Sequence, residues 1–351
     1  MMLPALLAVT LAAGAAGEMR AAGRPEQIAE GVYTIIHPDA TENWPNGNTT
    51  IIIGSHSALV VDSGYLPATA RGDIQALRAL TDKPVRFLVN THWHYDHTNG
   101  NAEYRRAFPD VQIVAHRETR RLLDANARRY ARTASDGASA AQLGALRKLL
   151  AESRTTSGAP LSDPQRAEVQ QRIAAFELEA SELGAFRYEP PSMLFDTEIA
   201  VDLGGREVRI VHVGRGNTPG DTVVFLPKER VVIAGDLLVA PVPFCYYSFP
   251  REWVQTLARV RELDATVVVP GHGDVQRDWA YLDSVAELLR YVIAAVERSP
   301  GRTSDEVRRG IDLTAFRDRM AGQNPVLRET FEQSVVKALV ERTFLSVRGG
   351  A

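Results

Sequence analysis

Short runs of β-branched and other apolar residues, separated by Gly, Pro, Asn and Ser, predict strands in the first third of the chain. Two stretches between these runs have a helical pattern instead. In chain order, the predicted elements are strands at 31–36, 49–53 and 58–62, a helix at 68–80, a strand at 85–90, a helix at 101–107 and a strand at 111–115. Because strands and helices alternate, the pattern indicates an α/β fold.

The strand pattern is interrupted between residues 117 and 186, where Ala, Leu, Arg, Glu and Gln dominate and predict helices. Strands resume after this stretch, at 198–203, 207–213, 222–226, 231–234 and 266–269. The end of the chain again has a helical pattern. We therefore expect one catalytic domain in two strand-rich halves, with a helical insertion between them. The expected limits are 24–116 for the first half, 117–190 for the insertion, 191–275 for the second half and 276–351 for a helical C-terminal extension.

The composition is that of an ordinary globular protein, since 45% of the 351 residues are hydrophobic and 24% are charged. A formal net charge of -3 and the lack of a dense basic tract give no electrostatic basis for binding nucleic acid. We therefore expect a small-molecule substrate and no nucleic-acid partner. The sequence gives no indication of the oligomeric state.

Residues 3–16 form an apolar run, rich in Ala and Leu, that is too short to span a bilayer and is followed by small residues. This pattern predicts a secretory signal peptide at 1–20. It also predicts a periplasmic or secreted protein with no stable membrane insertion after the leader is removed. The first four residues lack the Lys or Arg expected before the apolar run, so an N-terminal helix without a targeting role is the alternative.

A dense group of residues with metal-binding side chains follows the predicted strand at 85–90. The segment Thr-His-Trp-His-Tyr-Asp-His offers four such side chains: His92, His94, Asp96 and His97. An extended backbone would place the first three on one side, and His97 could turn the other way, so that one loop serves two neighbouring metal ions. Imidazole nitrogens and carboxylate oxygens suit zinc, iron or manganese.

This segment resembles the His-X-His-X-Asp-His signature of the metallo-β-lactamase superfamily, and the resemblance extends from about residue 31 to residue 273, outside the insertion. It implies a four-layer αβ/βα sandwich and a centre for one or two zinc ions, with iron or manganese as alternatives. Asp62 matches an Asp that orients the metal loop, Asp236 matches a carboxylate that bridges two metal ions, and His272 matches the last histidine ligand. The implied ligands are His92, His94, Asp96, His97, Asp236 and His272.

One position departs from the superfamily pattern. Where the family usually has Gly-X-Gly-His, this chain has Gly-Arg-Gly-Asn, so that Asn217 takes the place of a histidine of the first metal site. An amide oxygen is a weaker donor to zinc than imidazole, and we expect the site of His92 and His94 to hold its metal less tightly. Asn217 could instead hold a water molecule or a substrate carbonyl. His212 and Asp221 are weaker candidates to complete this site.

Aromatic residues follow Asp236 closely, in the loop 242–250: Phe244, Tyr246, Tyr247 and Phe249. With Trp93 and Tyr95 they could form an apolar wall over the metals, and packing in the core is the equal alternative. Cys245, the only cysteine, excludes a thiolate-rich metal site and is expected to be a small buried side chain. The other histidines have no partners at ligand spacing and are expected to be structural: His37, His56 and His116.

These features predict a metal-dependent hydrolase that activates water for attack on an ester, lactone, thioester or amide bond of a small molecule. Asp96 or Asp236 would help to move the proton, and Asn217 is the third predicted catalytic residue. The alternative within this class is hydrolysis of a β-lactam ring, and the alternative from another class is a metal-binding periplasmic protein with little turnover. Redox members of the superfamily are disfavoured. Flavodiiron proteins usually have Glu in place of His94, and persulfide dioxygenases rely on the histidine that Asn217 replaces.

Overall fold

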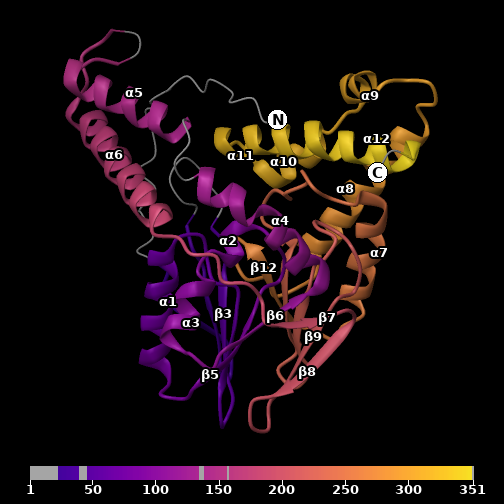
Figure 1. Ribbon diagram of the computed structural model, residues 1–351. Coiled ribbons are helices and arrows are strands. Elements are labelled where there is room, and N and C mark those ends of the chain that lie inside the picture. Colours follow the sequence, from indigo (N-terminus) through magenta and orange to yellow (C-terminus); the bar gives the residue numbers. More distant parts are fainter. Residues whose placement is uncertain (1–22, 39–45, 134–137, 156–157, 350–351) are drawn as a thin grey trace.

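The computed structural model describes residues 23–38, 46–133, 138–155 and 158–349 (Figure 1). The predicted signal peptide at 1–20 lies outside these residues. Two β-sheets face each other, and helices cover the outer face of each sheet, which gives the expected four-layer αβ/βα sandwich. Within the described ranges, no helix is both long enough and apolar enough to cross a membrane.

The first sheet has seven strands in the order β1 to β7. They are β1 (Glu26–Ala29), β2 (Val32–Ile35), β3 (Thr49–Ile53), β4 (Ala58–Val61), β5 (Val85–Val89), β6 (Gln112–His116) and β7 (Met193–Phe195). The pairs from β1 to β4 are antiparallel, and the pairs from β4 to β7 are parallel. β4 is buried along its whole length, which explains why it reads Ala-Leu-Val-Val without a polar position.

The second sheet has five strands in the order β12-β11-β10-β9-β8. They are β8 (Glu198–Asp202), β9 (Glu207–Val211), β10 (Val223–Leu226), β11 (Val231–Val239) and β12 (Val267–His272). β11 and β12 are parallel, and the other pairs are antiparallel. The edge strand β8 alternates exposed and half-buried side chains, because one of its faces meets solvent.

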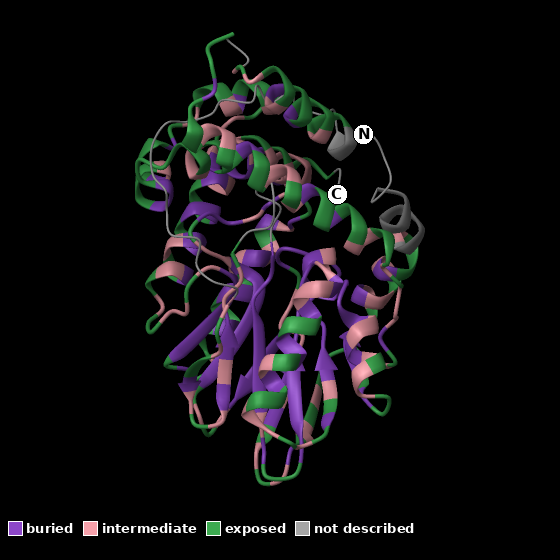
Figure 2. Cartoon of the chain, turned by 90° about the vertical axis from the view of Figure 1, so that its left-hand side faces the viewer, coloured by how far each residue is buried: buried purple, intermediate pink, exposed green. Residues whose placement is uncertain are grey.

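Apolar side chains from both sheets fill the space between them. The cluster includes Leu59 and Val89 of the first sheet and Ile210 and Val224 of the second, all fully buried. Figure 2 shows the strands as an almost continuous buried layer beneath more exposed helices. The core between the sheets therefore holds the two halves of the chain together.

Helices α1 (Pro67–Leu80) and α3 (Asn101–Ala107) cover the outer face of the first sheet, and α7 (Pro250–Arg261) and α8 (Ala280–Glu297) cover that of the second. A C-terminal group of helices packs against α7 and α8. It consists of α9 (Ser304–Gly310), α10 (Thr314–Ala321), α11 (Pro325–Phe331), the π-helix η2 (Glu332–Leu339) and α12 (Val340–Arg348). These helices lie at the same end of the sandwich as the short helix α2 (Tyr95–Thr98) (Figure 1).

Three helices separate β6 from β7, where the sequence predicts a helical insertion. They are α4 (Arg117–Thr133), α5 (Ala138–Glu152) and α6 (Asp163–Gly184). α5 and α6 pair through a small core that includes Leu146, Val169 and Phe176, and Figure 1 shows them extending away from the sandwich. The division of the chain into domains at the numbered limits given above stays a prediction.

The predicted strands are all present, and most of their ends shift by one or two residues. Strands β1 and β7 were not predicted from the sequence. β1 reads Glu-Gln-Ile-Ala and β7 has three residues, so neither shows a recognisable strand pattern. β11 continues to Val239 instead of ending at 234, because Asp236 interrupts the apolar run without ending the pairing with β12.

Candidate metal centre

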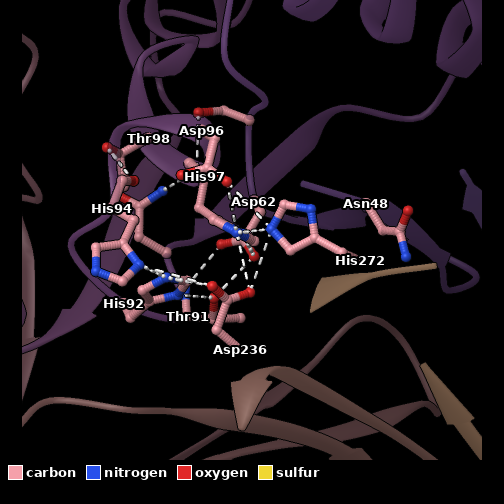
Figure 3. A network of polar contacts seen from close by, with 12 residues as sticks. Asn48, Asp62, Thr91, His92, His94, Asp96, His97, Thr98, Asp236 and His272 are labelled. Atoms are coloured by element: carbon pink, nitrogen blue, oxygen red, sulfur yellow. Dashed lines mark hydrogen bonds and ion pairs between the residues drawn. The ribbon is translucent and has the colours of Figure 1, made fainter. Parts of the chain in front are cut away.

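The candidate ligands come from chain segments that meet at one edge of the sandwich (Figure 3). Asp62 follows β4, the 91–97 segment follows β5, Asp236 lies in β11 and His272 ends β12. β4 pairs in parallel with β5, and β11 pairs in parallel with β12. Because the carboxyl ends of parallel strands lie at one edge of a sheet, the topology brings these residues together.

The prediction of an extended backbone through Asp96 is wrong. The segment turns at His94, and the next four residues form the helical turn α2. Two hydrogen bonds to the carbonyl oxygen of His94 close the turn, one from His97 N at 3.2 Å and one from Thr98 Oγ1 at 3.0 Å. Successive side chains on a helix point about 100° apart, so Asp96 and His97 approach the centre from different directions.

Four side-chain atoms converge in what we call the Asp96 cluster: Asp96 Oδ2, His97 Nε2, Asp236 Oδ1 and His272 Nε2. His97 Nε2 lies 3.4 Å from Asp96 Oδ2 and 3.2 Å from Asp236 Oδ1. His272 Nε2 lies 3.1 Å and 3.4 Å from the same oxygens and 3.1 Å from His97 Nε2. Ligands bound about 2.0 Å from a tetrahedral zinc ion are about 3.3 Å apart. The observed separations therefore fit one metal ion.

A second group, the His92 cluster, consists of His92 Nε2, His94 Nδ1 and Asp236 Oδ2. The two nitrogens lie 2.8 Å apart, and Asp236 Oδ2 lies 3.3 Å from His92 Nε2 and 3.6 Å from His94 Nδ1. Asp236 thus directs Oδ2 to this cluster and Oδ1 to the Asp96 cluster (Figure 3). Oδ1 is buried and has no hydrogen-bond partner among the described residues. A buried carboxylate oxygen of this kind fits a position at which it contacts a cation.

Asp236 does not end its strand, contrary to prediction. The pairing of β11 with β12 shifts register on both sides of Gly235, which has a φ of +52°. Such a bulge redirects the side chain that follows it. A Cβ at Gly235 would lie 2.7 Å from Thr91 Cβ, and a Cβ at Gly271 would lie 2.1 Å from Asp236 Oδ1. Glycine at both positions leaves room for the metal loop and for the carboxylate.

Asp62 contacts the ligand-bearing segment 91–97 at Thr91 and His97. Its Oδ1 accepts a hydrogen bond from Thr91 N at 2.8 Å, and its Oδ2 accepts one from Thr91 Oγ1 at 2.8 Å. Asp62 Oδ2 also lies 2.7 Å from His97 Nδ1. A proton on Nδ1 leaves the lone pair of His97 Nε2 directed into the Asp96 cluster. This geometry agrees with the orienting role that the superfamily resemblance implies.

Burial and neighbouring charge set the protonation states of the centre. Burial lowers the pKa of His92 to about 4, so that its imidazole is neutral, which is the form that binds a metal. Burial alone would raise the pKa of Asp236, but the neighbouring imidazoles, above all His97, hold it well below its usual range. Asp236 and Asp96 raise the pKa of His97 and His272, so that metal binding must displace a proton from these two imidazoles. Imidazole nitrogens and ionised carboxylates are a donor set that suits zinc, iron or manganese.

Comparison with known families identifies the superfamily of the chain. Residues 43–272 match the family model described as the metallo-beta-lactamase superfamily. The chain belongs to this superfamily. The candidate ligands of this metallo-beta-lactamase superfamily member all lie within the matched residues.

Two curated relatives align with most of the sequence of this superfamily member. A linear primary-alkylsulfatase from Pseudomonas sp. (strain ATCC 19151) is 26% identical over 291 residues, which are 78% of this chain and 51% of that protein. The 2,4-dinitroanisole O-demethylase subunit alpha from Nocardioides sp. (strain JS1661) is 24% identical over 280 residues, 77% of this chain and 63% of that protein. The chain thus spans between half and two thirds of the length of these relatives.

A solved metallo-beta-lactamase from Pontibacter korlensis has the same fold, with a TM-score of 0.54 and 19% identity over 76% of this chain and 98% of that chain. Similarity at this identity concerns the fold alone. The superfamily match and the buried His and Asp clusters agree with a protein built to hold metal ions. They do not specify the substrate.

Asn217, the predicted substitute for a histidine ligand, is fully buried. Its Nδ2 donates a hydrogen bond to the carbonyl oxygen of Phe244, whose ring centroid lies 5.3 Å from that of His94. Asn217 Oδ1 is buried and has no hydrogen-bond partner in the described part of the chain. The residue thus has one free acceptor, which can receive a hydrogen bond from a water molecule or contact a cation.

His212 and Asp221, the weaker candidates for the first metal site, have other partners. The ring of His212 stacks on that of His116, with centroids 4.1 Å apart, and His212 Nδ1 lies 2.7 Å from the carbonyl oxygen of Asp221. The carboxylate of Asp221 accepts hydrogen bonds from Thr218 N at 2.9 Å and Thr218 Oγ1 at 2.6 Å. Neither residue belongs to a metal-ligand cluster of the described residues.

The stacked histidines predict how stability changes with pH. Burial lowers the pKa of both His116 and His212, because the interior disfavours the charged imidazolium. A lowered folded-state pKa contributes stability that is present above the ordinary value of 6.5 and is lost as the pH falls through the folded-state value. We therefore expect the fall in Tm between about pH 7 and about pH 5 to be smaller in His212→Asn than in the wild type.

Thermal melts at the two pH values test this expectation. Asparagine keeps a donor near the position of Nδ1 and does not titrate. His56→Asn is the control, because His56 is exposed, and it should retain the pH dependence of the wild type. If the Tm of His212→Asn depends on pH as steeply as that of the wild type, His212 is not the source of this pH dependence.

Three aromatic side chains surround the ring of His94 and form the predicted apolar wall. The ring centroids of Trp93, Phe244 and Tyr247 lie 4.8, 5.3 and 5.5 Å from that of His94. Trp93 is buried, whereas Tyr247 is 41% exposed and lies at the rim. Trp93 Nε1 is buried and has no hydrogen-bond partner among the residues described, so the indole can donate to a bound molecule. The other predicted wall residues pack elsewhere: Tyr246 on Phe244, Phe249 under Arg215 and Tyr95 on Tyr65.

Tyr65 links the loop after β4 to the helical insertion, a contact that was not predicted from the sequence. Its hydroxyl donates to Oε1 of Glu179, a buried residue of α6, at 2.6 Å. Arg71 of α1 forms an ion pair with Glu182 of α6 at 2.7 Å. These contacts attach α6 beside the loop that follows β4. Because the partners are more than a hundred positions apart and have ordinary local surroundings, no pattern in the sequence could have paired them.

His37 and His116 have structural partners, and the structural role predicted for His56 stays a prediction. His37 Nε2 lies 3.1 Å from Asp73 Oδ2, and His116 Nε2 lies 3.0 Å from the carbonyl oxygen of Asp196. Cys245 is fully buried, and burial raises the pKa of its thiol to about 12. The thiol is therefore protonated at neutral pH and is not a nucleophile.

Proposed function

We propose that this chain uses one or two divalent metal ions to hydrolyse an ester, lactone, thioester or amide bond of a small molecule. The observation that carries the proposal is the position of Asp236, whose two oxygens face two buried clusters 3.2 to 3.6 Å away. A carboxylate in this position can bind two cations and reduce their mutual repulsion. The residues that would hold the ions are His92, His94, Asp96, His97, Asp236 and His272.

When bound, such ions lower the pKa of a water molecule and polarise the scissile bond. The chain supplies the other requirements. Asp96 Oδ2 and Asp236 Oδ2 are carboxylate oxygens at the centre that can accept a proton and return it to the leaving group. Asn217 Oδ1 or Trp93 Nε1, both buried and without a hydrogen-bond partner among the described residues, can orient the substrate.

Zinc is the ion that we propose, with iron or manganese as alternatives. Imidazole and carboxylate donors with separations close to those of a tetrahedral zinc site support this choice. The predicted signal peptide supports a periplasmic or secreted enzyme. A small-molecule substrate and the absence of a nucleic-acid partner are proposed on the basis of the net charge of -3.

The aromatic wall favours a substrate that carries an apolar group next to the reacting bond. Trp93, Phe244 and Tyr247 present such a surface beside His94. The similarity to a linear primary-alkylsulfatase over 78% of this chain adds a second candidate, an alkyl sulfate ester. Hydrolysis of a β-lactam ring stays a third possibility, and the similarity to solved metallo-beta-lactamases concerns the fold alone.

One experiment tests the proposed function. The protein is purified without chelator, its metal content is measured by elemental analysis, and it is assayed on p-nitrophenyl esters, a lactone, a thioester, a β-lactam and dodecyl sulfate. We expect turnover of at least one compound, loss of turnover on chelation and recovery on addition of zinc. Metal-loaded protein that turns over none of these compounds would contradict the proposal and favour a metal-binding periplasmic protein with little turnover.

Asn217 should determine how many metal ions the chain holds. Because an amide oxygen is a weaker donor than imidazole, we expect the wild type to hold one ion tightly and Asn217→His to hold two. The control Asn217→Ala removes the same oxygen without adding a ligand and should not gain an ion. Elemental analysis after gel filtration gives the three values. Two tightly held ions in the wild type would contradict this expectation and make Asn217 part of a dinuclear site.

A further inference from the structure

The C-terminal helices contact the aromatic wall through one buried hydroxyl group. Ser334 Oγ donates to the carbonyl oxygen of Pro243 at 2.6 Å and accepts a hydrogen bond from Cys245 N at 2.9 Å. Ser334 is 1% exposed. It therefore holds the backbone on both sides of Phe244, a member of the wall. We propose that Ser334 is a positioning residue, which fixes Phe244 and Tyr247 against the metal centre and thereby sets the preference for substrates with an apolar group.

The surroundings of Ser334 show that its contact with the loop is specific. Ser334 lies in the π-helix η2, and its neighbours on the buried face, Phe331, Val335 and Leu339, are apolar. A hydroxyl buried among apolar side chains is costly unless its donor and its acceptor both find partners. The loop supplies both partners, from residues about ninety positions earlier in the chain. π-Helical turns occur frequently at functional sites, because they shift side chains out of the regular helical register.

Two further side chains are hydrogen-bonded to the backbone of this loop, one at Phe244 and one at Ser248. Asn217 Nδ2 donates to the carbonyl oxygen of Phe244, and Arg342 Nε of α12 donates to that of Ser248 at 2.9 Å. Together with Ser334, these contacts restrain the backbone from 243 to 248. Two of the three attachments come from the C-terminal helices, which lie at the same end of the sandwich as α2 (Figure 1). The C-terminal extension is therefore part of the construction of the site.

The restrained loop determines where the apolar surface lies. Phe244 and Tyr247 keep centroid distances of 5.3 and 5.5 Å from His94, and Tyr247 lies 5.3 Å from Trp93. An acyl or alkyl chain that extends from the reacting bond can pack against these rings. Burying one methylene group strengthens binding roughly fourfold, provided that the surface is already in place. This inference rests on the proposed function for its substrate, whereas the restraint of the loop does not.

The principal test compares Ser334→Ala with Ser346→Ala, which removes a hydroxyl of α12 that bonds only to Thr343 O at 3.0 Å in the described contacts. The substrates are p-nitrophenyl acetate and p-nitrophenyl octanoate. For Ser334→Ala we expect the KM of the octanoate to rise about tenfold, with kcat for the acetate within about twofold of wild type and unchanged metal content. Ser346→Ala should behave as the wild type. Equal octanoate-to-acetate selectivity in the two variants would overturn the proposal.

Two measurements separate this inference from the proposed function. Hydrogen exchange in the peptide that covers 242–249 should be about tenfold faster in Ser334→Ala, whether or not any ester is a substrate. Calorimetric binding of octanoate should weaken by a similar factor. If these two changes are seen but no compound of the panel is turned over, the proposed function alone would be overturned. If hydrogen exchange and octanoate binding in Ser334→Ala both match the wild type, the inference would be overturned.

A second variant keeps the inference testable if Ser334→Ala does not fold. Phe244→Ala removes one ring of the wall and leaves the C-terminal helices and the contacts of Ser334 to the loop backbone in place. We expect it to reduce the octanoate-to-acetate selectivity at least tenfold and to retain its metal ions. Unchanged selectivity in Phe244→Ala would show that the wall does not bind the apolar group, and would overturn the inference.

Discussion

Replacing Asp236 by asparagine is expected to lower kcat/KM by at least about a thousandfold and to remove most of the bound metal. Asp236 Oδ1 lies 3.2 Å from His97 Nε2, and Asp236 Oδ2 lies 3.3 Å from His92 Nε2, so one carboxylate serves both clusters. An amide has a single oxygen and no charge, and it cannot replace the carboxylate at both positions. The kinetics on the best compound of the panel and elemental analysis of the same preparation measure the two effects.

Asp73→Asn is the matched control for this substitution. Asp73 is also buried and also contacts a histidine, His37, at 3.1 Å, but it lies in α1 away from the ligand clusters. It should keep both activity and metal. Thermal melts of the two variants separate loss of the site from loss of the fold. Full activity in a folded Asp236→Asn protein would rule out the bridging role.

Replacing Asp62 by asparagine is expected to weaken metal binding by about 10- to 100-fold, although Asp62 is not a proposed ligand. Its carboxylate contacts His97 Nδ1 at 2.7 Å and the backbone and hydroxyl of Thr91 at 2.8 Å, so it fixes both the ring and the loop. Asparagine is the informative substitution because Asp62 has a φ of +61°, a conformation that Asn tolerates better than most residues. Competition with a chelator gives the metal affinity.

The two variants, Asp62→Asn and Asp236→Asn, should also differ in how far added zinc restores their activity. At a saturating concentration of zinc, Asp62→Asn should regain most of its kcat, because all six proposed ligands are still present. Asp236→Asn should not recover. Metal affinity in Asp62→Asn equal to that of the wild type would contradict the orienting role of the carboxylate.

The motif at 91–97 could be recognised because four metal-binding side chains are close in sequence, and chance rarely assembles such a group. The direction in which each side chain points could not be predicted in the same way. The extended backbone expected for Asp96 gave way to the helical turn α2, which is closed by hydrogen bonds to His94 O. Such local hydrogen bonds compete with an extended strand end, and a short run of polar residues does not indicate which conformation prevails.

The contacts that distant helices make with the site could not be predicted from local sequence. Ser334 and Glu179 occupy unremarkable positions in helical stretches, yet one hydrogen-bonds to the loop of Phe244 and the other to Tyr65. Each contact joins residues far apart in the chain. Their pairing depends on how whole helices pack on the sandwich. The hydrophobic pattern of a helix predicts which face is buried, but it does not predict which polar residues that face will contact.

The α/β class, the ligand types and the order of the ligands along the chain were determined by the sequence, because periodicity and local clustering are properties of neighbouring residues. The division of the ligands into two clusters was decided only by the tertiary structure, through the parallel pairing of β4 with β5 and of β11 with β12 and through the bulge at Gly235. That bulge aims the two oxygens of Asp236 at different clusters, and its geometry depends on a neighbouring strand that lies more than thirty positions away.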